Sequence, residues 1–379
     1  MARTTATGPV LSRRQLNRAT LERQLLLDRV TMPAVDAVAH LFGLQAQVPL
    51  VPYTTLWNRL DGFVPDHLAA PLMDRVLVRT ALMRSTVHLV TADDALALRP
   101  RMHVVLARAF GSTAWARKLR EVGAVLDPER DAFLAAARRL LQEQPLARAE
   151  LGPPLGEQFP DLDHESMTWA ATYLLPVLQV TPRGVWGQTG QATWTTLSAW
   201  LGEQAERTAP MDPDTLVLRY LGAFGPASVK DVQAWCGLTR LREVAERLGD
   251  ALRPYRTDDG APLLDLAEGT LPDPDTPAPV RFLAEYDNVT LGYADRTRIL
   301  SDGDYEPIPG GPGGAVGTVL VDGLVSAMWA LRRSGDTATL VVRPAVPLSA
   351  TEREAVADEG RRLLGFLAAG AEHGLAWQP

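Results

Sequence analysis

The sequence predicts an α+β protein that is mainly helical and is built from small repeated modules. Three times along the chain, apolar residues at helical spacing are followed by alternating β-forming and turn residues. Four prolines between Leu271 and Val280 then exclude a helix or a central strand and indicate a linker. Beyond this linker the pattern changes to strands and one final helix. We therefore expect three tandem winged helix-turn-helix modules and a C-terminal β-rich domain.

The first module is expected at residues 11–130. Leu11 to about Val30 has the spacing of an amphipathic helix. Apolar residues before Gly43 indicate a second helix, which this glycine can end in a left-handed conformation. Pro49 and Pro52 suit the start of a third helix, so that the pair of helices around Gly43 forms a helix-turn-helix.

The rest of the first module and the second module continue this plan. Residues 82–90 favour a strand, Thr91 opens a helix with a capping-box pattern, and residues 101–145 look helical throughout. The second module is expected at residues 131–205, with a helix over residues 163–178 before its strand pair.

The third module is expected at residues 211–270. Ser228 and Asp231 have the spacing of a capping box, and Asp258-Asp259-Gly260 suits the turn of a hairpin. The C-terminal domain is expected at residues 278–379. Its strands and final helix are expected at residues 281–291, 318–333, 339–344 and 349–370.

Composition excludes several classes of protein. The chain has 379 residues, which is enough to bury several cores. No stretch of 18 apolar residues exists and the N-terminus lacks an apolar signal core, so we expect a cytoplasmic protein with no membrane partner. Cys236 is the only cysteine, which argues against a disulfide, a zinc finger or an iron–sulfur cluster.

The charge is distributed unevenly along the chain. The formal net charge is −7, yet residues 1–120 carry 16 Arg or Lys and only 8 Asp or Glu. A basic face in the first third could bind a polyanion. The alternative is that arginine-rich helices simply present solvated faces. Only Lys118 and Lys230 are lysines, and neither lies in a context that suggests a buried amine able to form a Schiff base.

Two glutamines, Gln45 and Gln47, lie in the turn of the first helix-turn-helix. Residues two apart in an extended segment point in the same direction, so both amides could address one point. Amides can hold a water molecule or a base edge, but they are neither strong acids nor bases nor nucleophiles. The alternative is that both glutamines merely cap the turn.

Residues 42–63, 77–94 and 282–300 resemble the winged-helix DNA glycosylases of the AlkZ and YcaQ kind. The resemblance extends over most of the chain, from about Leu11 to Leu367. It implies removal of bulky N7-alkylguanine adducts and unhooking of interstrand crosslinks. In the AlkZ branch the two glutamines of a Gln-x-Gln motif are catalytic, which implies that role for Gln45 and Gln47. The YcaQ branch has an acid at the second position, and this chain does not.

Candidate DNA-binding residues come from three stretches. On or near the first predicted wing they are Arg79, Arg84 and His88. In the basic helical segment they are Arg99 and Arg101. In the family-like segment after the linker they are Asn288, Arg296 and Arg298. For His88 the alternative is a partly buried histidine in a strand. For the last three residues it is an internal salt-bridged turn.

Other motifs carry no chemistry. His164-Glu165 begins like a metalloprotease helix but lacks the second histidine, and the six histidines form no cluster along the chain. Residues 310–314 are glycine-rich, but no Lys-Ser/Thr follows, so a mobile hairpin tip is favoured over a phosphate loop. We expect neither a metal nor a cofactor.

The resemblance, together with the lack of a suitable lysine, implies a monofunctional DNA glycosylase that acts as a monomer on double-stranded DNA carrying N7-alkylguanine adducts or crosslinks. A role in self-resistance to a genotoxic natural product would fit bulky lesions. Two alternatives stay open at this point. One is a winged-helix regulator that binds DNA without chemistry, and the other is a housekeeping glycosylase for simple alkylated purines.

Overall fold

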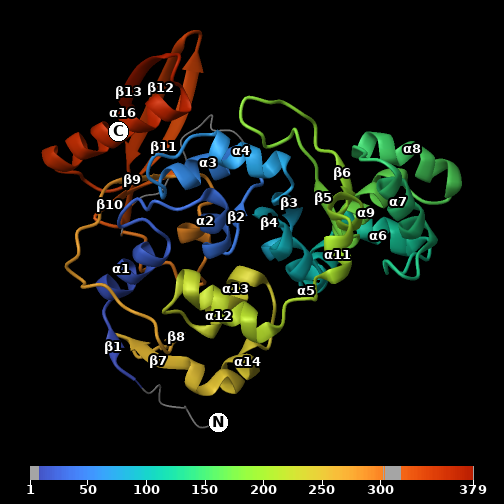
Figure 1. Cartoon of the computed structure of the whole chain (residues 1–379), viewed down its shortest axis with the longest axis horizontal. Coiled ribbons are helices and arrows are strands. Elements are labelled where there is room, and N and C mark those ends of the chain that lie inside the picture. Colours follow the sequence, from blue (N-terminus) through green and yellow to red (C-terminus); the bar gives the residue numbers. More distant parts are fainter. Residues whose placement is uncertain (1–7, 302, 304–316, 379) are drawn as a thin grey trace.

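The computed structural model describes residues 8–301, 303 and 317–378. Four groups of elements follow one another along the chain. Figure 1 shows the first group (blue) at the centre, the helices of the second group (green) on one side, the third group (yellow) below, and the C-terminal sheet (red) projecting at the opposite upper side. The first group therefore contacts all the others.

The first helix of the first group begins with a reciprocal capping box, which Ser12 and Gln15 form. Its remaining helices surround a short strand that contains Gln45. The elements are β1 (Val10–Leu11), α1 (Arg13–Arg23), α2 (Ala34–His40), β2 (Leu44–Gln45), α3 (Val51–Trp57), α4 (Asp66–Met73), β3 (Leu77–Ala81), the 3-10 turn η1 (Met83–Ser85) and β4 (Val87–Thr91).

The second group extends the sheet of the first. One five-stranded antiparallel sheet is formed by the strands β2, β4, β3, β5 and β6 in that order, and Arg79 of β3 pairs with Gln179 of β5. A strand pair from the second group thus joins the sheet whose edge strand, β2, contains Gln45. The elements are α5 (Ala92–Gly111), α6 (Ala114–Glu121), α7 (Ala132–Glu143), α8 (Arg148–Gln158), α9 (His164–Leu174), β5 (Val177–Gln179), β6 (Trp194–Thr196), α10 (Leu197–Leu201) and α11 (Glu203–Arg207).

The third group packs three helices on a small sheet. Strand β1 from the N-terminus joins this sheet parallel to β7, in the order β1-β7-β8. The largest apolar core joins this group to the first two, since Phe42, Met102 and Trp235 belong to one buried cluster. The elements are α12 (Pro213–Phe224), α13 (Val229–Cys236), α14 (Leu241–Leu248), the 3-10 turn η2 (Gly249–Ala251), β7 (Leu252–Thr257) and β8 (Pro262–Leu266).

The C-terminal group is a five-stranded sheet in the order β13-β12-β11-β10-β9, covered by one long helix. Strands β12 and β13 are parallel, and the other neighbours are antiparallel. Phe282, Val356 and Leu363 lie in the core between sheet and helix. The elements are β9 (Arg281–Leu283), α15 (Asn288–Leu291), β10 (Gly317–Val321), β11 (Leu324–Ser334), β12 (Thr337–Pro344), α16 (Ala350–Leu367) and β13 (Glu372–Trp377).

Local predictions from capping and turn residues are confirmed. Ser228 and Asp231 form a capping box, and Ser349 caps α16. The hairpin turn lies at residues 258–260 between β7 and β8, and the proline-rich linker contains neither helix nor strand. The α+β class agrees with this mixture of helices and sheets. The division into three winged-helix modules stays an interpretation.

Several element boundaries were predicted wrongly. Residues 101–145 form parts of three helices with a loop at 122–131, because Gly123 and Pro128 interrupt the helical pattern. The expected strand over 82–90 begins with the turn η1, and the expected strand over 281–291 ends at Leu283. Helix α9 ends at Leu174, ahead of β5. The predicted hairpin tip at 310–314 lies outside the described residues.

Candidate functional site: a glutamine segment between two hollows

The glutamine segment leaves α2 through a left-handed turn. Phe42 and Gly43 both have positive φ, 56° and 91°. A Cβ on Gly43 would lie 2.7 Å from Cγ1 of Val90, so both the conformation and the space require glycine. Asn288 in α15 holds the turn, since its side-chain amide donates to the carbonyl oxygens of Leu41 (3.2 Å) and Gly43 (2.9 Å). The C-terminal group therefore fixes the segment in which the glutamines lie.

Both glutamine side chains are oriented by donors from the neighbouring strand connection. Gln45 pairs with His88 across β2 and β4 and is 6% exposed, and its Oε1 accepts from Nη2 of Arg84 at 3.0 Å. Gln47 is exposed, and its Oε1 accepts from the backbone N–H of Val87 at 3.2 Å. Because each partner is a donor, each carbonyl oxygen must face it. Each carbonyl oxygen is thus anchored by its own donor, and the expected shared direction of the two amides stays a prediction.

What the pair can do chemically follows from this anchoring. Among the described residues, neither side-chain NH₂ group of Gln45 or Gln47 has a hydrogen-bond partner. Each carbonyl oxygen also keeps a second lone pair. The pair therefore offers fixed donors and acceptors for a water molecule or a sugar, with no negative charge of its own.

Arg84 supplies a positive charge directly beside Gln45. Arg84 and Ser85 both adopt left-handed conformations, with φ of 53° and 59°, which costs on the order of 1 kcal/mol or more for a residue other than glycine. The turn aims the guanidinium at Gln45 and at the carbonyl oxygen of Trp235, 2.9 Å from Nη1. Burial lowers the pKa of Arg84 to about 10, so it stays charged at neutral pH.

Arg79 and His88, expected on a wing surface, lie inside the sheet. Nη2 of Arg79 donates to the carbonyl oxygen of Ala46 at 2.8 Å, so this arginine supports the residue between the two glutamines. Burial, and then Arg183, lower its pKa to about 10. His88 is 1% exposed, and burial followed by the charge of Arg84 lowers its pKa to about 3. It is therefore neutral at physiological pH, and its Nδ1 contacts the carbonyl oxygen of Thr86.

One hollow opens at Gln47 toward the second group, and we call it the aromatic hollow. Its volume is about 260 Å³. Within it the Arg148 guanidinium lies between two rings, 3.5 Å from the centroid of Trp169 and 4.6 Å from that of Trp194. Burial lowers the pKa of Arg148 to about 10. Its lining residues are Gln47, Ala81, Ser85, Val87, Arg148, Trp169, Thr172, Tyr173, Gln179, Arg183, Ala192 and Trp194.

A larger hollow, which we call the apolar pocket, starts at the next residue, Val48. It has a volume of about 750 Å³ and lies between the start of α3, the β5–β6 loop and the C-terminal sheet. Figure 1 shows this loop reaching from β5 toward α3 and α4 before it returns to β6. The hydroxyl of Tyr53 holds it there by bonding to the carbonyl oxygen of Gly184 and the N–H of Trp186. Arg183 lines both hollows.

The other candidate DNA-binding residues are dispersed. Arg99 is 2% exposed and donates to the carbonyl oxygens of Tyr173 and Leu175 between α5 and α9. Arg101 is partly buried against the carbonyl oxygen of Met211. Their contacts suit support of the fold, and neither lines the two hollows beside the glutamines.

The residues after β9 also divide between interior and surface. Asn288 is buried under the glutamine turn, as described above. Arg298 is buried and donates to the carbonyl oxygen of Pro226 at 2.7 Å, with its guanidinium over the ring of Tyr293. Arg296 is exposed. Of these three, only Arg296 presents its charge to the surface.

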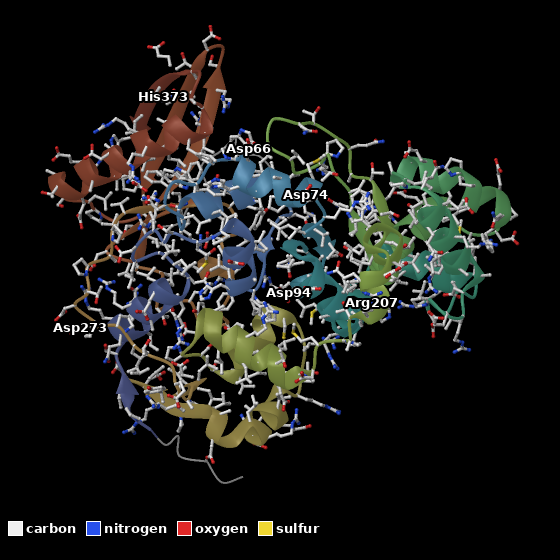
Figure 2. All side chains as sticks on the ribbon, viewed as in Figure 1. Asp66, Asp74, Asp94, Arg207, Asp273 and His373 are labelled. Atoms are coloured by element: carbon white, nitrogen blue, oxygen red, sulfur yellow. The ribbon has the colours of Figure 1, made fainter. Side chains whose placement is uncertain are left out.

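A third hollow, of about 830 Å³, is larger but lies elsewhere. It is bounded by α2, α10 and the start of α5, and four aspartates line it against two arginines. Figure 2 labels two of them, Asp74 and Asp94, away from the C-terminal sheet that forms a wall of the apolar pocket. One of the arginines, Arg219, is already paired with Asp94. An acidic wall is a poor match for the phosphates of DNA.

Neither a metal-binding cluster nor a buried lysine is found in the described part of the chain. No group of three or more His, Cys, Asp or Glu residues there could hold a metal ion. Lys118 is exposed and 3.7 Å from a carboxylate oxygen of Asp163, and Lys230 is exposed. No helix within residues 8–301, 303 and 317–378 is long and apolar enough to cross a membrane.

Arg148, Arg183 and Glu285 were missed as site residues by reasoning from the sequence. Arg148 and Arg183 lie in the second group, far along the chain from Gln45, and only the pairing of β3 with β5 brings them close. A weak signal exists in the sequence, since Arg183 precedes Gly184 in a turn-rich stretch. Glu285 lines the apolar pocket, and no pattern in the sequence distinguishes it from the nearby Asp287 as a site residue.

An uncharged amide pair, beside arginines without carboxylate partners, is the kind of site that works by positioning and suits a nucleic-acid substrate. Comparison with known proteins agrees with this class. The chain belongs to the AlkZ-like DNA glycosylase family, whose model matches residues 38–366. It is 25% identical over 369 residues to the interstrand DNA cross-link repair glycosylase of Streptomyces sahachiroi, covering 90% of this chain and 94% of that protein.

The fold is also similar to a solved one. The structure of the Streptomyces sahachiroi DNA glycosylase AlkZ superposes with a TM-score of 0.73, at 20% identity, and the match covers 97% of this chain and 100% of the other. The similarity thus extends over all four groups of elements.

Proposed function

We propose that this chain is a monofunctional DNA glycosylase that hydrolyses the N-glycosidic bond of bulky N7-alkylguanine adducts and unhooks interstrand crosslinks. The observation that carries the proposal is the fixed placement of the pair, with Gln45 buried beside Arg84 and Gln47 exposed at the aromatic hollow. The family of the chain and the crosslink-repair name of its Streptomyces relative support the same reading.

The chemistry fits a site without an acid. An N7-alkylated guanine already carries a positive charge, so the departing base needs no proton. The remaining task is to hold a water molecule at the anomeric carbon while the sugar becomes oxocarbenium-like. A water molecule can accept from an amide NH₂ of the pair and donate to the free lone pair of a carbonyl oxygen. The base leaves with the electron pair of the C–N bond as neutral N7-alkylguanine, and the proton that the bound water loses passes to solvent. Arg84 fixes the orientation of Gln45 by donating to its Oε1.

The product is expected to be an intact abasic site. A lyase reaction needs an amine that attacks the sugar, and the amines of Lys118 and Lys230 are both exposed and outside the two hollows. The enzyme acts as a monomer on double-stranded DNA, without metal or cofactor. Self-resistance to a genotoxic natural product explains a need for bulky-lesion excision better than housekeeping repair of simple alkyl lesions.

The test uses a duplex with one N7-alkylguanine, incubated with the protein and a chelator. Free adducted base is measured by mass spectrometry, and the DNA is analysed with and without hot alkali. We expect base release, with strand breaks only after alkali, and loss of both in Gln45→Ala. Breaks without alkali would show a lyase. Tight binding without base release would instead show a DNA-binding regulator.

A further inference from the structure

The apolar pocket has the size and composition of a site for a drug-sized group. Its volume of about 750 Å³ lies within the usual range for ligand pockets, about 300–1,000 Å³. Trp186, Trp329 and Leu331 contribute to its walls, together with Val51 at the start of α3. The pocket begins at Val48, the residue after Gln47, so the substituent of a base whose sugar lies at Gln47 can enter it.

Among the described residues, one carboxylate lines this pocket, and it has no partner there. Glu285 is partly exposed, yet its Oε2 is buried and makes no hydrogen bond. The two other charged residues of the lining are occupied elsewhere, because Arg183 donates to the carbonyl oxygen of Gly190 and Arg333 to that of Leu367. Burial raises the pKa of Glu285 to about 7. A buried polar atom without a partner inside a cavity marks a place where a ligand can bind.

The neighbouring acid shows that this lack of a partner is specific to Glu285. Asp287, two residues further on, is completely buried and makes two hydrogen bonds to Arg59, of 2.8 and 2.9 Å. The same short segment thus contains one carboxylate that holds the fold together and one that faces a cavity. A structural role accounts for Asp287 and leaves Glu285 unexplained.

We propose that the apolar pocket receives the alkyl substituent of the adduct, and that Glu285 selects substituents carrying a cationic amine or another hydrogen-bond donor. This assignment rests on the proposed glycosylase function and adds the chemistry of its substrate. Apolar surface of the substituent is buried against the tryptophans and aliphatic walls. The donor satisfies Oε2 of Glu285, which otherwise stays desolvated without a bond. Gln45 and Gln47 act on the sugar, whereas the pocket decides which lesion is held.

The test compares three duplexes that differ only at N7 of one guanine: methyl, benzyl and 4-(aminomethyl)benzyl. Single-turnover excision rates are measured for wild type, Val51→Phe and Glu285→Gln. Val51 is a partly exposed pocket residue, so a larger side chain fills the pocket without entering a core. Val64→Phe is the matched control, because Val64 is 48% exposed and lines none of the three hollows. Thermal melting confirms that each variant is folded.

We expect Val51→Phe to slow excision of both benzyl adducts about tenfold or more while the methyl adduct stays within about threefold. Glu285→Gln should slow only the aminomethyl adduct by a comparable factor. In wild type, the rate ratio of aminomethylbenzyl to benzyl should rise as the pH increases through about 7, because Glu285 ionises there, and it should be flat in Glu285→Gln.

Two results would overturn the assignment. If Glu285→Gln slows all three substrates equally, its role is structural or catalytic and not selective. If Val51→Phe changes the excision rates of the methyl and benzyl adducts by the same factor, the substituent lies outside the pocket. Failure of the underlying function has a different signature: wild type then releases no base from any of the three duplexes, and the pocket assignment falls with it.

Discussion

The arginines at the glutamine segment differ from two that join the groups of the molecule. These two buried arginines meet carboxylates: Arg59 meets Asp287, with both side chains 0% exposed, and Arg23 meets Asp265 at 2.5 Å. A third junction arginine, Arg298, meets only a carbonyl oxygen and an aromatic ring. Around the glutamines, the described arginines have no carboxylate partner. They contact carbonyl oxygens, an amide or aromatic rings instead, and they are Arg79, Arg84, Arg148 and Arg183.

This difference separates two uses of the same side chain. A buried arginine that meets an acid cancels its field and fixes two elements relative to each other. A buried arginine that contacts only carbonyl dipoles keeps its positive potential, which attracts neighbouring phosphates. Burial lowers the pKa values of Arg79, Arg84 and Arg148 to about 10, and this cost is tolerated at the site. The contrast can be tested by removing or supplying a charge in each region.

The largest effect is expected at a junction. Arg59→Met should lower the free energy of unfolding by about 3–5 kcal/mol, because it leaves the buried Asp287 carboxylate without its cation, with only the N–H of Val289 as a donor. Urea unfolding measures this loss. The matched change at the site, Arg84→Met, should cost about 1–3 kcal/mol, since it leaves two neutral acceptors, on Gln45 and Trp235, without a donor but no buried charge. Equal losses in both variants would remove the distinction between the two regions.

The next effect concerns catalysis. Gln45→Ala and Gln47→Ala should each slow excision by about 10²–10³, while DNA affinity changes by only a few-fold, since each removes one positioning group. Single-turnover kinetics and fluorescence anisotropy measure the two quantities. Gln158→Ala serves as control, because Gln158 is exposed at the end of α8. Full activity of the double variant would contradict the proposed role of the pair.

His88 predicts a pH effect on stability. Its pKa falls from an ordinary 6.5 to about 3 on folding. Between these values the unfolded chain binds a proton that the folded protein excludes, so stability is lost as the pH falls. From pH 7.5 to 5 the loss is about 2 kcal/mol. Urea midpoints for His88→Phe should vary less with pH, whereas the exposed-residue control His67→Gln should behave as wild type.

The smallest effect tests the free charge of Arg84. Arg84→Met should reduce the slope of log binding constant against log salt by about one, if its charge is used by phosphate. Gln45→Glu should do the same by giving Arg84 the carboxylate that the two paired junction arginines have, and it should also raise the melting temperature. An unchanged slope in both variants would show that the unpaired charge does not act on DNA.

The sequence by itself determined the local features of this protein. Caps at Ser228 and Ser349, the hairpin at 258–260 and the linker after Leu271 depend on neighbours within a few residues, and each was predicted correctly. Gly43 belongs to the same class, because a left-handed turn favours glycine whatever surrounds it. The position of Gln45 and Gln47 just after this turn could therefore be predicted from the sequence.

Only the tertiary structure decided which charges are buried and which pairs meet. A strand has two faces, and no pattern around Arg79 or His88 tells which face the sheet covers. The pairing of β3 with β5 brings Arg148 and Arg183 to the glutamines, and the C-terminal group adds Glu285 and a pocket wall. Partners so far apart in sequence are selected by packing of whole elements. That packing is a property of all the buried surfaces together, and it cannot be read from any one stretch of the chain.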